Sequence, residues 1–223
     1  MRILYHLPLD PGCRLVRILM REKALDFEMY AEKVWERRSE FLTLNPAGEV
    51  PVLIDEGDQV VCGSAMVITE YLEEVCPEPG FLGHTAAERA EVRRLMSWFD
   101  DKFRREVTVN LVDEKLMKRF LGLGEPNSAA IRAGHANIHY HLDYIGWLCD
   151  RRTWLAGDDL SLADITAAAH LSALDYLGDV PWKDHPGAKD WYARFKSRPS
   201  MRDVLADLIP GAPPSKHYSD LDF

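Results

Sequence analysis

The fold is decided by residues 40–74, which read EFLTLNPAGEVPVLIDEGDQVVCGSAMVITEYLEE. Short apolar stretches at 51–55 and 59–62 have the composition of strands, and the turn-forming residues 56–58 separate them. Ser64 then stands at the N-cap position before an amphipathic run, where a helix is expected to begin. The stretch therefore predicts a loop, a β-hairpin and a helix in direct succession.

The residues before this stretch add three further elements. Residues 2–7 are β-rich, and 26–30 alternate polar with apolar side chains, as strands do. Between them, 12–24 place apolar side chains at helical spacing among Arg and Glu. The order strand, helix, strand, hairpin, helix is thioredoxin-like, and Val50-Pro51 stands where such folds keep a cis proline.

After residues 76–80, which read CPEPG, the chain becomes helical. Long helices are predicted at 87–117 and 128–149, each ended by a Gly-containing break. Ser161 and Asp164 have the spacing of a capping box at the start of a buried helix, and residues 184–208 complete the last helices. We therefore predict an α/β thioredoxin-like domain at 1–76, a linker at 77–83, an all-α domain at 84–208 and a Pro-rich tail at 209–223.

These features together resemble the glutathione S-transferase (GST) superfamily over residues 1–208. The stretch LAGDDLSLADITAAA, residues 155–169, is similar to the N-capping motif of the GST helical domain. The resemblance implies a cleft that binds glutathione. It also implies that a hydroxyl or thiol near the end of the first strand lowers the pKa of the glutathione thiol.

Two anchors of that chemistry are missing. Most members carry an acidic residue or Gln before the Ser that grips the γ-glutamyl end, but here the pair is Gly63-Ser64. Losing this acceptor removes a charge-assisted hydrogen bond worth about 1–3 kcal/mol. The thiol-activating Ser of serine-type members falls at Asp10 or Pro11, and an ionised carboxylate would repel a thiolate while Pro has no donor.

We therefore predict no catalytic residue, weak or absent glutathione binding and a vestigial glutathione site. Its positions are Asp10, Pro11, Val50, Pro51, Gly63 and Ser64. Cys13 is the alternative source of thiol chemistry, since a helix N-terminus can activate a cysteine. A core-facing Cys13 is the simpler interpretation.

Composition and charge exclude several classes of function. With a net charge of −9 the chain lacks the overall basic balance of nucleic-acid or anionic-membrane binders. It has no apolar run long enough to span a bilayer and no signal-peptide pattern at its start, and its four cysteines form no CxxC pair. We expect reduced cysteines and a cytoplasmic location. His135 and His139 share a helical face, but no Cys or Glu completes a metal site, so we predict neither a metal nor a cofactor.

A basic rim is expected beside the cleft. Lys33, Arg37 and Arg38 surround Trp35 in the sequence, and Trp and Arg are enriched at protein-binding hot spots. Arg14, Arg17 and Arg21 are expected to project from the first helix and to extend this rim toward an acidic partner. A mixed, solvated surface segment is the alternative.

The tail combines a stiff spacer, 210–215, with Tyr218, Leu221 and Phe223, which prefer a pocket to water. It either binds a partner or docks on its own body and shapes the site. We predict that deleting 216–223 leaves folding intact and reduces partner binding. The predicted partner-binding residues are His6, Leu9, Asp10, Pro11, Trp35, Arg37, Arg38, Lys216, Tyr218, Asp220, Leu221 and Phe223.

The whole chain, including its Ser219–Phe223 end, also resembles GST-like bacterial cell-division proteins that bind FtsZ. This resemblance implies a non-catalytic homodimer at the division site that binds FtsZ filaments and changes their curvature or bundling. The helix at 87–117 carries interleaved Arg and acidic residues and corresponds to the helix that helps form the GST dimer. Two alternatives stay open: a glutathione S-transferase with an atypical thiol-activating site, and a glutathione-independent stress adaptor.

Overall fold

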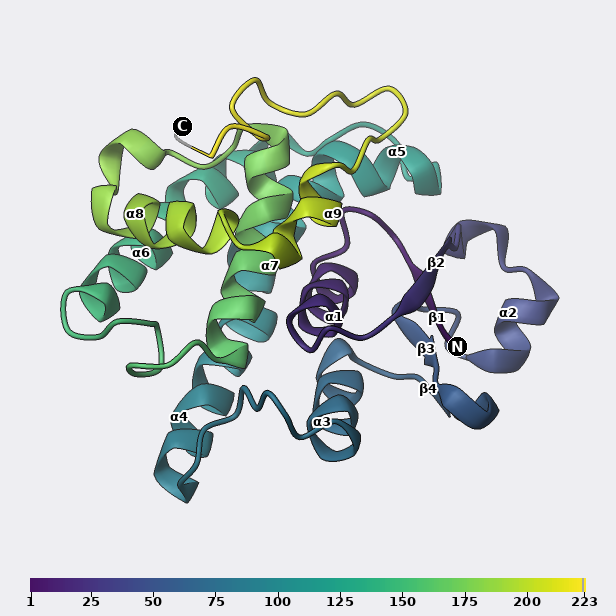
Figure 1. The fold of residues 1–223 in the computed structure, drawn as a ribbon. Coiled ribbons are helices and arrows are strands. Elements are labelled where there is room, and N and C mark those ends of the chain that lie inside the picture. The colour runs from purple at the N-terminus through teal and green to yellow at the C-terminus, as the bar shows by residue number, and fades with distance from the viewer. Residues whose placement is uncertain (222) are drawn as a thin grey trace.

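The computed structural model describes residues 1–221 and 223. A small four-stranded sheet lies at one end of the molecule and helices make up the rest (Figure 1). The strands are β1 (Arg2–His6), β2 (Phe27–Ala31), β3 (Val52–Ile54) and β4 (Val60–Val61). Their order in the sheet is β2-β1-β3-β4, with β1 parallel to β2 and the other pairs antiparallel. The predicted strands are confirmed, and the Val50-Pro51 peptide is cis.

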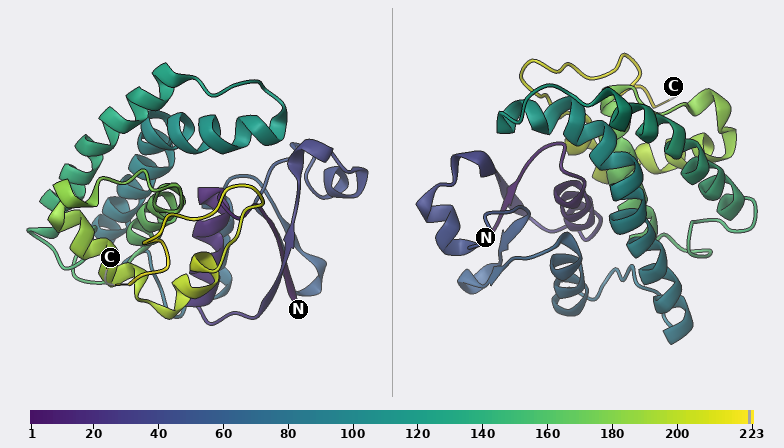
Figure 2. Two further views of the ribbon diagram at one scale, coloured as in Figure 1. Left: turned by 90° about the horizontal axis from the view of Figure 1, so that it is seen from above. Right: turned by 180° about the vertical axis from the view of Figure 1, so that it is seen from behind.

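One long rod dominates the helical region. It runs through α4 (Ala86–Ser97), η3 (Trp98–Met117), whose turns are of the wide π type, and α5 (Lys118–Leu121). It ends at Gly122, which adopts the left-handed conformation that glycine favours. The right-hand view of Figure 2 shows the rod from behind, beside α6 (Ser128–Cys149). The predicted long helices are therefore confirmed, although the first one extends a turn further.

The other helices are shorter, and α7 lies at the centre of the helical region. They are α1 (Pro11–Glu22), η1 (Val34–Glu36), α2 (Ser39–Leu44), η2 (Glu56–Asp58), α3 (Ala65–Val75), α7 (Leu162–Leu177), η4 (Trp182–Asp184), α8 (Pro186–Lys196), η5 (Pro199–Met201) and α9 (Arg202–Leu205).

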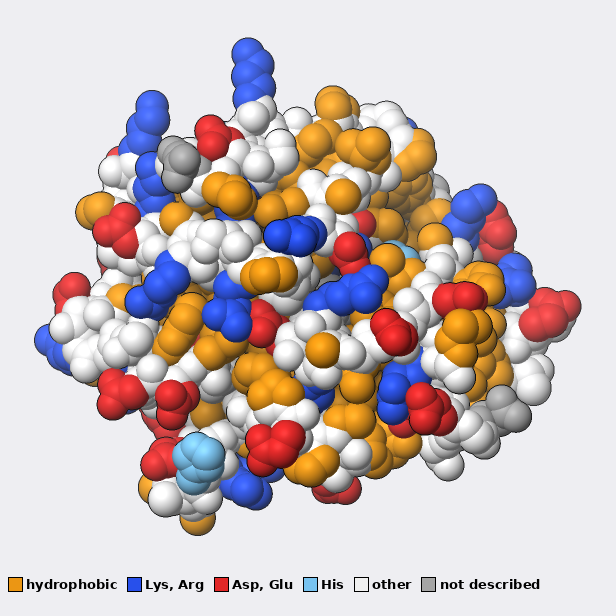
Figure 3. Space-filling view, viewed as in Figure 1, with side chains coloured by type: hydrophobic (Ala, Val, Ile, Leu, Met, Phe, Trp, Pro, Cys, Tyr) orange, Lys and Arg blue, Asp and Glu red, His pale blue; other side chains and the backbone are white. Residues whose placement is uncertain are grey.

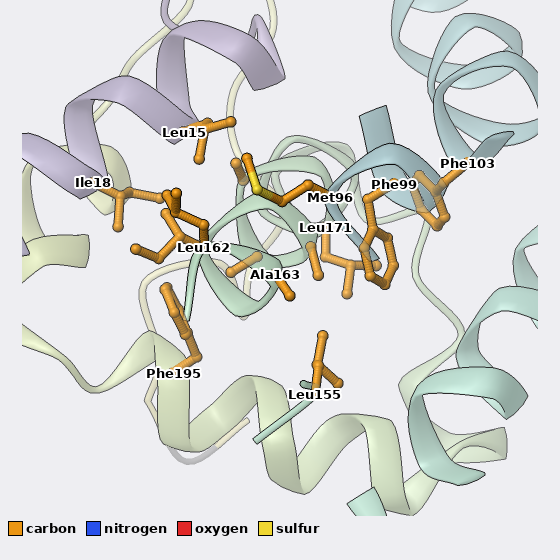
Figure 4. Close-up of a cluster of buried hydrophobic side chains, with 14 of the residues drawn as sticks. Leu15, Ile18, Met96, Phe99, Phe103, Leu155, Leu162, Ala163, Leu171 and Phe195 are labelled. Carbon is orange, nitrogen blue, oxygen red and sulfur yellow. The ribbon is translucent and has the colours of Figure 1, made fainter. Parts of the chain in front are cut away.

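The larger of two hydrophobic clusters among the described residues joins the sheet region to the helices. In the close-up of Figure 4, Ile18 of α1 lies beside Leu162 of α7, and Leu15 and Ala163 belong to the same cluster. At the start of α7 the buried carboxylate of Asp164 accepts hydrogen bonds from the Leu155 and Ser161 N–H groups, the Ser161 hydroxyl and the Trp191 indole. The predicted folding role of Asp164 is confirmed, because its negative charge is buried only with several donors around it.

The packing of α1 corrects the predicted basic rim. This helix is enclosed between the sheet and α7, so every residue from Pro11 to Met20 is buried. Arg14 and Arg17 therefore point into the protein, where both bond to the carboxylate of Asp207. Arg21 is partly exposed, but its Nε lies 2.6 Å from Asp203 Oδ2. The prediction that these three arginines form a free basic rim is wrong.

The described residues contain no helix that is both long and apolar enough to cross a bilayer.

Candidate functional site

A cleft of about 510 Å³ lies between the sheet region and the long rod. One wall comes from the β1–α1 loop and from residues 48–50 before β3, and the other comes from η3 and α5. Figure 2 shows these elements from above, and in Figure 3 hydrophobic side chains gather in the hollow between α5 and the segment that carries β2 and α2. The cleft brings together residues that are roughly one hundred positions apart in the sequence.

Asp10 holds the N-terminus of α1. Its Oδ1 accepts a 2.8 Å hydrogen bond from the Cys13 N–H, and Pro11 occupies the first helical position. This is ordinary N-capping, which stabilises a helix by about 1 kcal/mol. Asp10 and Pro11 both line the cleft, as predicted, but neither offers a proton to a ligand.

Cys13 is not a reactive thiol. Its side chain is completely buried, and its sulfur accepts a hydrogen bond from the Leu7 N–H. Burial, reinforced by the negative charge of Asp10, raises the pKa of the Cys13 thiol well above its ordinary value. Since the thiolate is the nucleophile, Cys13 does not supply the missing chemistry.

The predicted glutathione positions separate into two groups. Val50 lines the cleft together with Asp10 and Pro11, whereas Pro51, Gly63 and Ser64 are not part of its lining. Gly63 has φ +115°, a conformation that residues with side chains rarely adopt. The backbone at this turn therefore suits glycine and disfavours the acidic residue that the family usually carries there.

The opposite wall carries a hydroxyl that the sequence did not reveal as part of the site. Thr108 of η3 lines the cleft, and its Oγ1 lies 2.9 Å from His170 Nδ1. His170 is buried, and burial lowers its pKa, so the ring is neutral at physiological pH. Its Nε2 lies 3.7 Å from Asp100 Oδ1.

Asp113, one helical turn further along the rod, is a partly buried carboxylate that the charge of Arg104 stabilises through space. It lines the cleft, and among the described residues its side chain forms no hydrogen bond and no ion pair. Burial raises the pKa of Asp113 to about 6, and the charges of Asp10 and Glu114 act in the same direction while Arg104 opposes them. Asp113 is therefore mostly ionised at neutral pH, at a cost in stability.

An aromatic stack joins η1 of the sheet region to α5 of the long rod. Trp35 of η1 lies on Phe120 of α5 with ring centroids 5.2 Å apart and planes 5° apart. Trp35 thus packs against a ring from α5, next to the cleft-lining residues Val34 and Leu121, although neither ring lines the cleft itself. Arg37 is exposed beside Gly48 of the cleft lining, whereas Arg38 is paired with Glu32, with Nη2 2.6 Å from Oε2.

The structure corrects the assignment of His6 as a partner contact. Its side chain is 6% exposed. Burial, with the positive charge of Arg17 nearby, lowers the pKa of His6 to about 4, so the ring is a neutral interior group. Leu9 is also almost fully covered, but unlike His6 it lines the cleft.

The tail docks on the body of the protein. Tyr218 is 1% exposed, and its hydroxyl donates a 2.8 Å hydrogen bond to the Val204 carbonyl. Phe223 packs edge-on against Trp182, with ring centroids 5.4 Å apart. The expectation that the Tyr218 ring contacts a partner is therefore wrong for the docked tail, whereas Lys216, Asp220 and Leu221 are exposed.

Tyr218 supports the cleft from behind. Its ring belongs to a small hydrophobic cluster with Leu9, Leu116 and Tyr176, and Phe120 packs against the same cluster. Leu9 is therefore in contact with the tail cluster and lines the cleft at the same time. Of the two alternatives for the tail, the structure has the one in which it docks on its own body.

His135 and His139 do not form a shared site. His139 Nδ1 lies 2.8 Å from His185 Nε2, whereas His135 Nε2 lies 3.3 Å from Asp179 Oδ1. The two imidazoles therefore have separate partners on other elements, although they share a helical face.

Comparison with known proteins gives consistent matches over the chain. Residues 4–80 match the family described as "Glutathione S-transferase, N-terminal domain", and residues 142–199 match "Glutathione S-transferase, C-terminal domain". The chain is 50% identical over 225 aligned residues to "FtsZ-localized protein A" of Caulobacter vibrioides, and the alignment covers 100% of this chain and 98% of that protein.

Two solved structures superpose over the whole chain. A glutathione S-transferase from Rhodospirillum rubrum F11 is 58% identical with a TM-score of 0.97, and the match covers 100% of both chains. FzlA from C. crescentus is 50% identical with a TM-score of 0.96, and the match covers 100% of this chain and 99% of that one.

Proposed function

The chain belongs to the glutathione S-transferase superfamily, and from that premise we propose that it is a non-catalytic member that binds FtsZ filaments as a homodimer. In this role it assists bacterial cell division, at the division site, by changing filament curvature or bundling. The observation that carries the proposal is the 50% identity, over 98% of that protein, with FtsZ-localized protein A.

The chemistry of the cleft supports a non-catalytic role. At the β1–α1 turn Asp10 caps a helix and Cys13 is a buried, protonated thiol, so neither stabilises a glutathione thiolate. The carboxylates of Asp10 and Asp113 would repel such a thiolate across a partly desolvated cleft. No bound cofactor is needed for this function.

The cleft rim and the exposed part of the tail form the proposed contact surface for FtsZ. Trp35 and Arg37 are available at the rim, and Lys216, Asp220 and Leu221 lie on the exposed side of the tail. Tyr218 and Phe223 contribute indirectly, because they fix the tail to the body.

An aromatic stripe supports the proposed homodimer. Trp98 of η3 lies beside Tyr144 of α6, with centroids 4.6 Å apart, and Tyr144 lies 6.0 Å from Trp147. Tyr140 and Trp147 are 59% and 49% exposed, which is unusual for large aromatic side chains. A dimer through this face would present two copies of the cleft to one filament or to two, and so gain avidity.

The proposal is tested by co-sedimentation with polymerised FtsZ, with electron microscopy of the pellets and light scattering of the free protein. We expect the protein to pellet with polymer, to change filament shape or bundling, and to have the mass of a dimer. A monomer that stays in the supernatant would contradict the proposal.

The second candidate function is a glutathione S-transferase with an atypical thiol-activating site. The Thr108 hydroxyl, which lines the cleft beside His170, favours it, as does the full-length similarity to a transferase from Rhodospirillum rubrum. Retention on immobilised glutathione and conjugation of 1-chloro-2,4-dinitrobenzene test this candidate. Turnover that disappears in Thr108→Val would replace the non-catalytic proposal.

A further inference from the structure

The walls of the cleft are apolar, but their charges are unbalanced. Four carboxylates line it, from Asp10, Glu49, Asp113 and Glu114, against the two cations Arg104 and Lys118. Lys118 is already used, since its Nζ lies 2.7 Å from Glu114 Oε2. Three carboxylates and one guanidinium remain in the lining, and Arg37 adds one further cation at the rim beside Gly48, so the cleft still carries an excess of negative charge.

Among these four carboxylates, Asp113 has no hydrogen bond that stabilises the fold within the described residues. Asp10 caps α1, and Glu114 accepts hydrogen bonds from Lys118 and from the Asn127 N–H. Asp113 has no hydrogen bond or ion pair within the part of the chain that the structure describes. Partial burial nevertheless raises its pKa against the opposing charge of Arg104, so a further cation supplied to the cleft from outside would stabilise the ionised carboxylate.

The surroundings of Asp113 define the shape of that group. Val109, Val112, Met117 and Leu121 from the rod and Leu7 from the β1–α1 loop supply apolar walls. A Lys or Arg side chain matches both properties, because it buries an aliphatic stem and carries its charge at the tip. A glutathione thiolate matches neither, since it would bring a second negative charge.

We propose that the cleft receives a single Lys or Arg side chain, flanked by apolar residues, from the surface of a partner protein, with Asp113 as the anchoring carboxylate. The identity of that partner as FtsZ rests on the proposed function, but the chemistry of the contact does not. This assignment reverses the polarity expected from the sequence, which was a basic rim for an acidic partner.

The charged groups around Asp113 set the pH dependence of this contact. Asp10 at the N-terminus of α1 and the neighbouring Glu114 raise its pKa, and Arg104 on the same rod lowers it. Glu49 lines the cleft from the opposite wall, and Lys118 is held by Glu114. Because the pKa of free Asp113 is about 6, binding should weaken as the pH falls through that value.

A pair of short peptides tests the inference without FtsZ. Ac-Leu-Val-Arg-Leu-Val-NH₂ and its counterpart with Glu in place of Arg are added to the full-length protein, and the methyl NMR signals of Val109, Val112 and Met117 are followed. We expect the Arg peptide to shift these signals and the Glu peptide to shift them at least tenfold less at equal concentration. Equal shifts, or a preference for the Glu peptide, would overturn the inference.

Two variants separate binding from folding. Asp113→Asn should weaken the Arg peptide at least tenfold while its Tm stays equal or rises, because the substitution removes an unpaired charge. Asp101→Asn, on the same rod but in an exposed pair with Arg105, removes the same charge and should change binding less than twofold. Unchanged peptide binding in Asp113→Asn would overturn the inference, as would equal weakening in both variants.

The outcome is independent of the FtsZ proposal. Pelleting with FtsZ by a protein that does not discriminate between the two peptides would leave the proposed function standing and remove the inference. Discrimination by a protein that does not pellet would do the reverse.

Discussion

The two sides of the β1–α1 turn bury charged groups in opposite ways. Behind the turn, Arg14 donates to the Pro8 carbonyl, the Ser172 hydroxyl and Asp207, and Arg17 grips both carboxylate oxygens of Asp207 at 2.8 and 2.9 Å. In front of it, Asp113 lines the cleft without a hydrogen bond or ion pair among the described residues.

This difference distinguishes charged groups that stabilise the fold from charged groups that are available to a binding partner. A buried charge is tolerated when partners within the protein surround it. The cluster behind the turn meets that condition for its ion pairs with Asp207, although Arg17 Nε has no hydrogen-bond partner among the described residues. The carboxylate of Asp113 forms no ion pair among the described residues and so lowers the free energy of unfolding at neutral pH. We therefore expect a partner molecule to supply its cation. The cluster behind the turn therefore holds the fold together, whereas the cleft in front of it is available for binding.

The largest loss of stability is expected when the ion pairs behind the β1–α1 turn are broken. Asp207→Ala leaves the buried guanidinium groups of Arg14 and Arg17 without their carboxylate, and breaking such a pair costs about 3–5 kcal/mol of unfolding free energy. Urea denaturation followed by circular dichroism measures the loss. Asp101→Ala, which removes an exposed partner of Arg105, is the control and should cost less than about 1 kcal/mol. Equal losses in the two variants would contradict the comparison.

Removing the tail anchor should have the next largest effect. Tyr218→Ala empties the cluster that it forms with Leu9, Leu116 and Tyr176, and replacing a buried aromatic by Ala costs about 3–5 kcal/mol, less here because the site lies close to the surface. Deleting 216–223 should therefore destabilise the protein as well as weaken FtsZ binding. Tyr218→Phe, which loses only the bond to the Val204 carbonyl, should cost about 1 kcal/mol. A fully stable deletion variant would show that the tail does not support the cleft.

Removing the charge of Asp113 from the cleft should raise the stability of the protein rather than lower it. The pKa of Asp113 is raised by burial to about 6, so folding favours its protonated form. The associated stability is fully present below the ordinary pKa near 4 and is lost as the pH rises through 6, an effect of about 1–3 kcal/mol. Asp113→Asn should therefore match the wild type at pH 4 and exceed it at pH 7.5. Denaturation at the two pH values measures this, and a variant that is less stable at pH 7.5 would refute the assignment.

The smallest effect on stability is expected at the cleft mouth. The Trp35–Phe120 stack is exposed at its edge, and such aromatic pairs contribute about 0.5–1.5 kcal/mol. Trp35→Ala should lower the unfolding free energy by that amount or less, yet reduce FtsZ pelleting several-fold. Trp147→Ala removes an exposed indole from the proposed dimer face and should lower the mass seen by light scattering, whereas Trp35→Ala should leave that mass unchanged. The two variants therefore separate loss of filament contact from loss of dimerisation. Normal pelleting by Trp35→Ala would remove the mouth from the contact surface.

Local features of the fold could be predicted from the sequence. Turn residues at 56–58, the N-cap position of Ser64 and the Ser161–Asp164 box act within a few residues, and each marks an element boundary in the structure. The burial of α1 could not be predicted in this way. Arg14 and Arg17 have the composition of a surface, and only the packing of α7 and α9 from residues 162 onward encloses them.

The candidate site was predictable on one wall only. Leu9, Asp10, Pro11 and Val50 lie where the family resemblance places a cleft. Thr108, Asp113 and Phe120 belong to a long helix whose spacing shows which side chains share a face but not what that face meets. The tail was recognised by its exposed aromatic composition, yet its docking place against Val204 depends on contacts that no local pattern encodes.

Sedimentation with polymerised and unpolymerised FtsZ, at the same total concentration, tests the central claim most directly. We expect the protein to enter the pellet with polymer and added glutathione not to displace it. Asp113→Asn should enter the pellet less than Asp101→Asn. Equal amounts in the supernatant with and without polymer, together with glutathione conjugation by the same preparation, would contradict that claim.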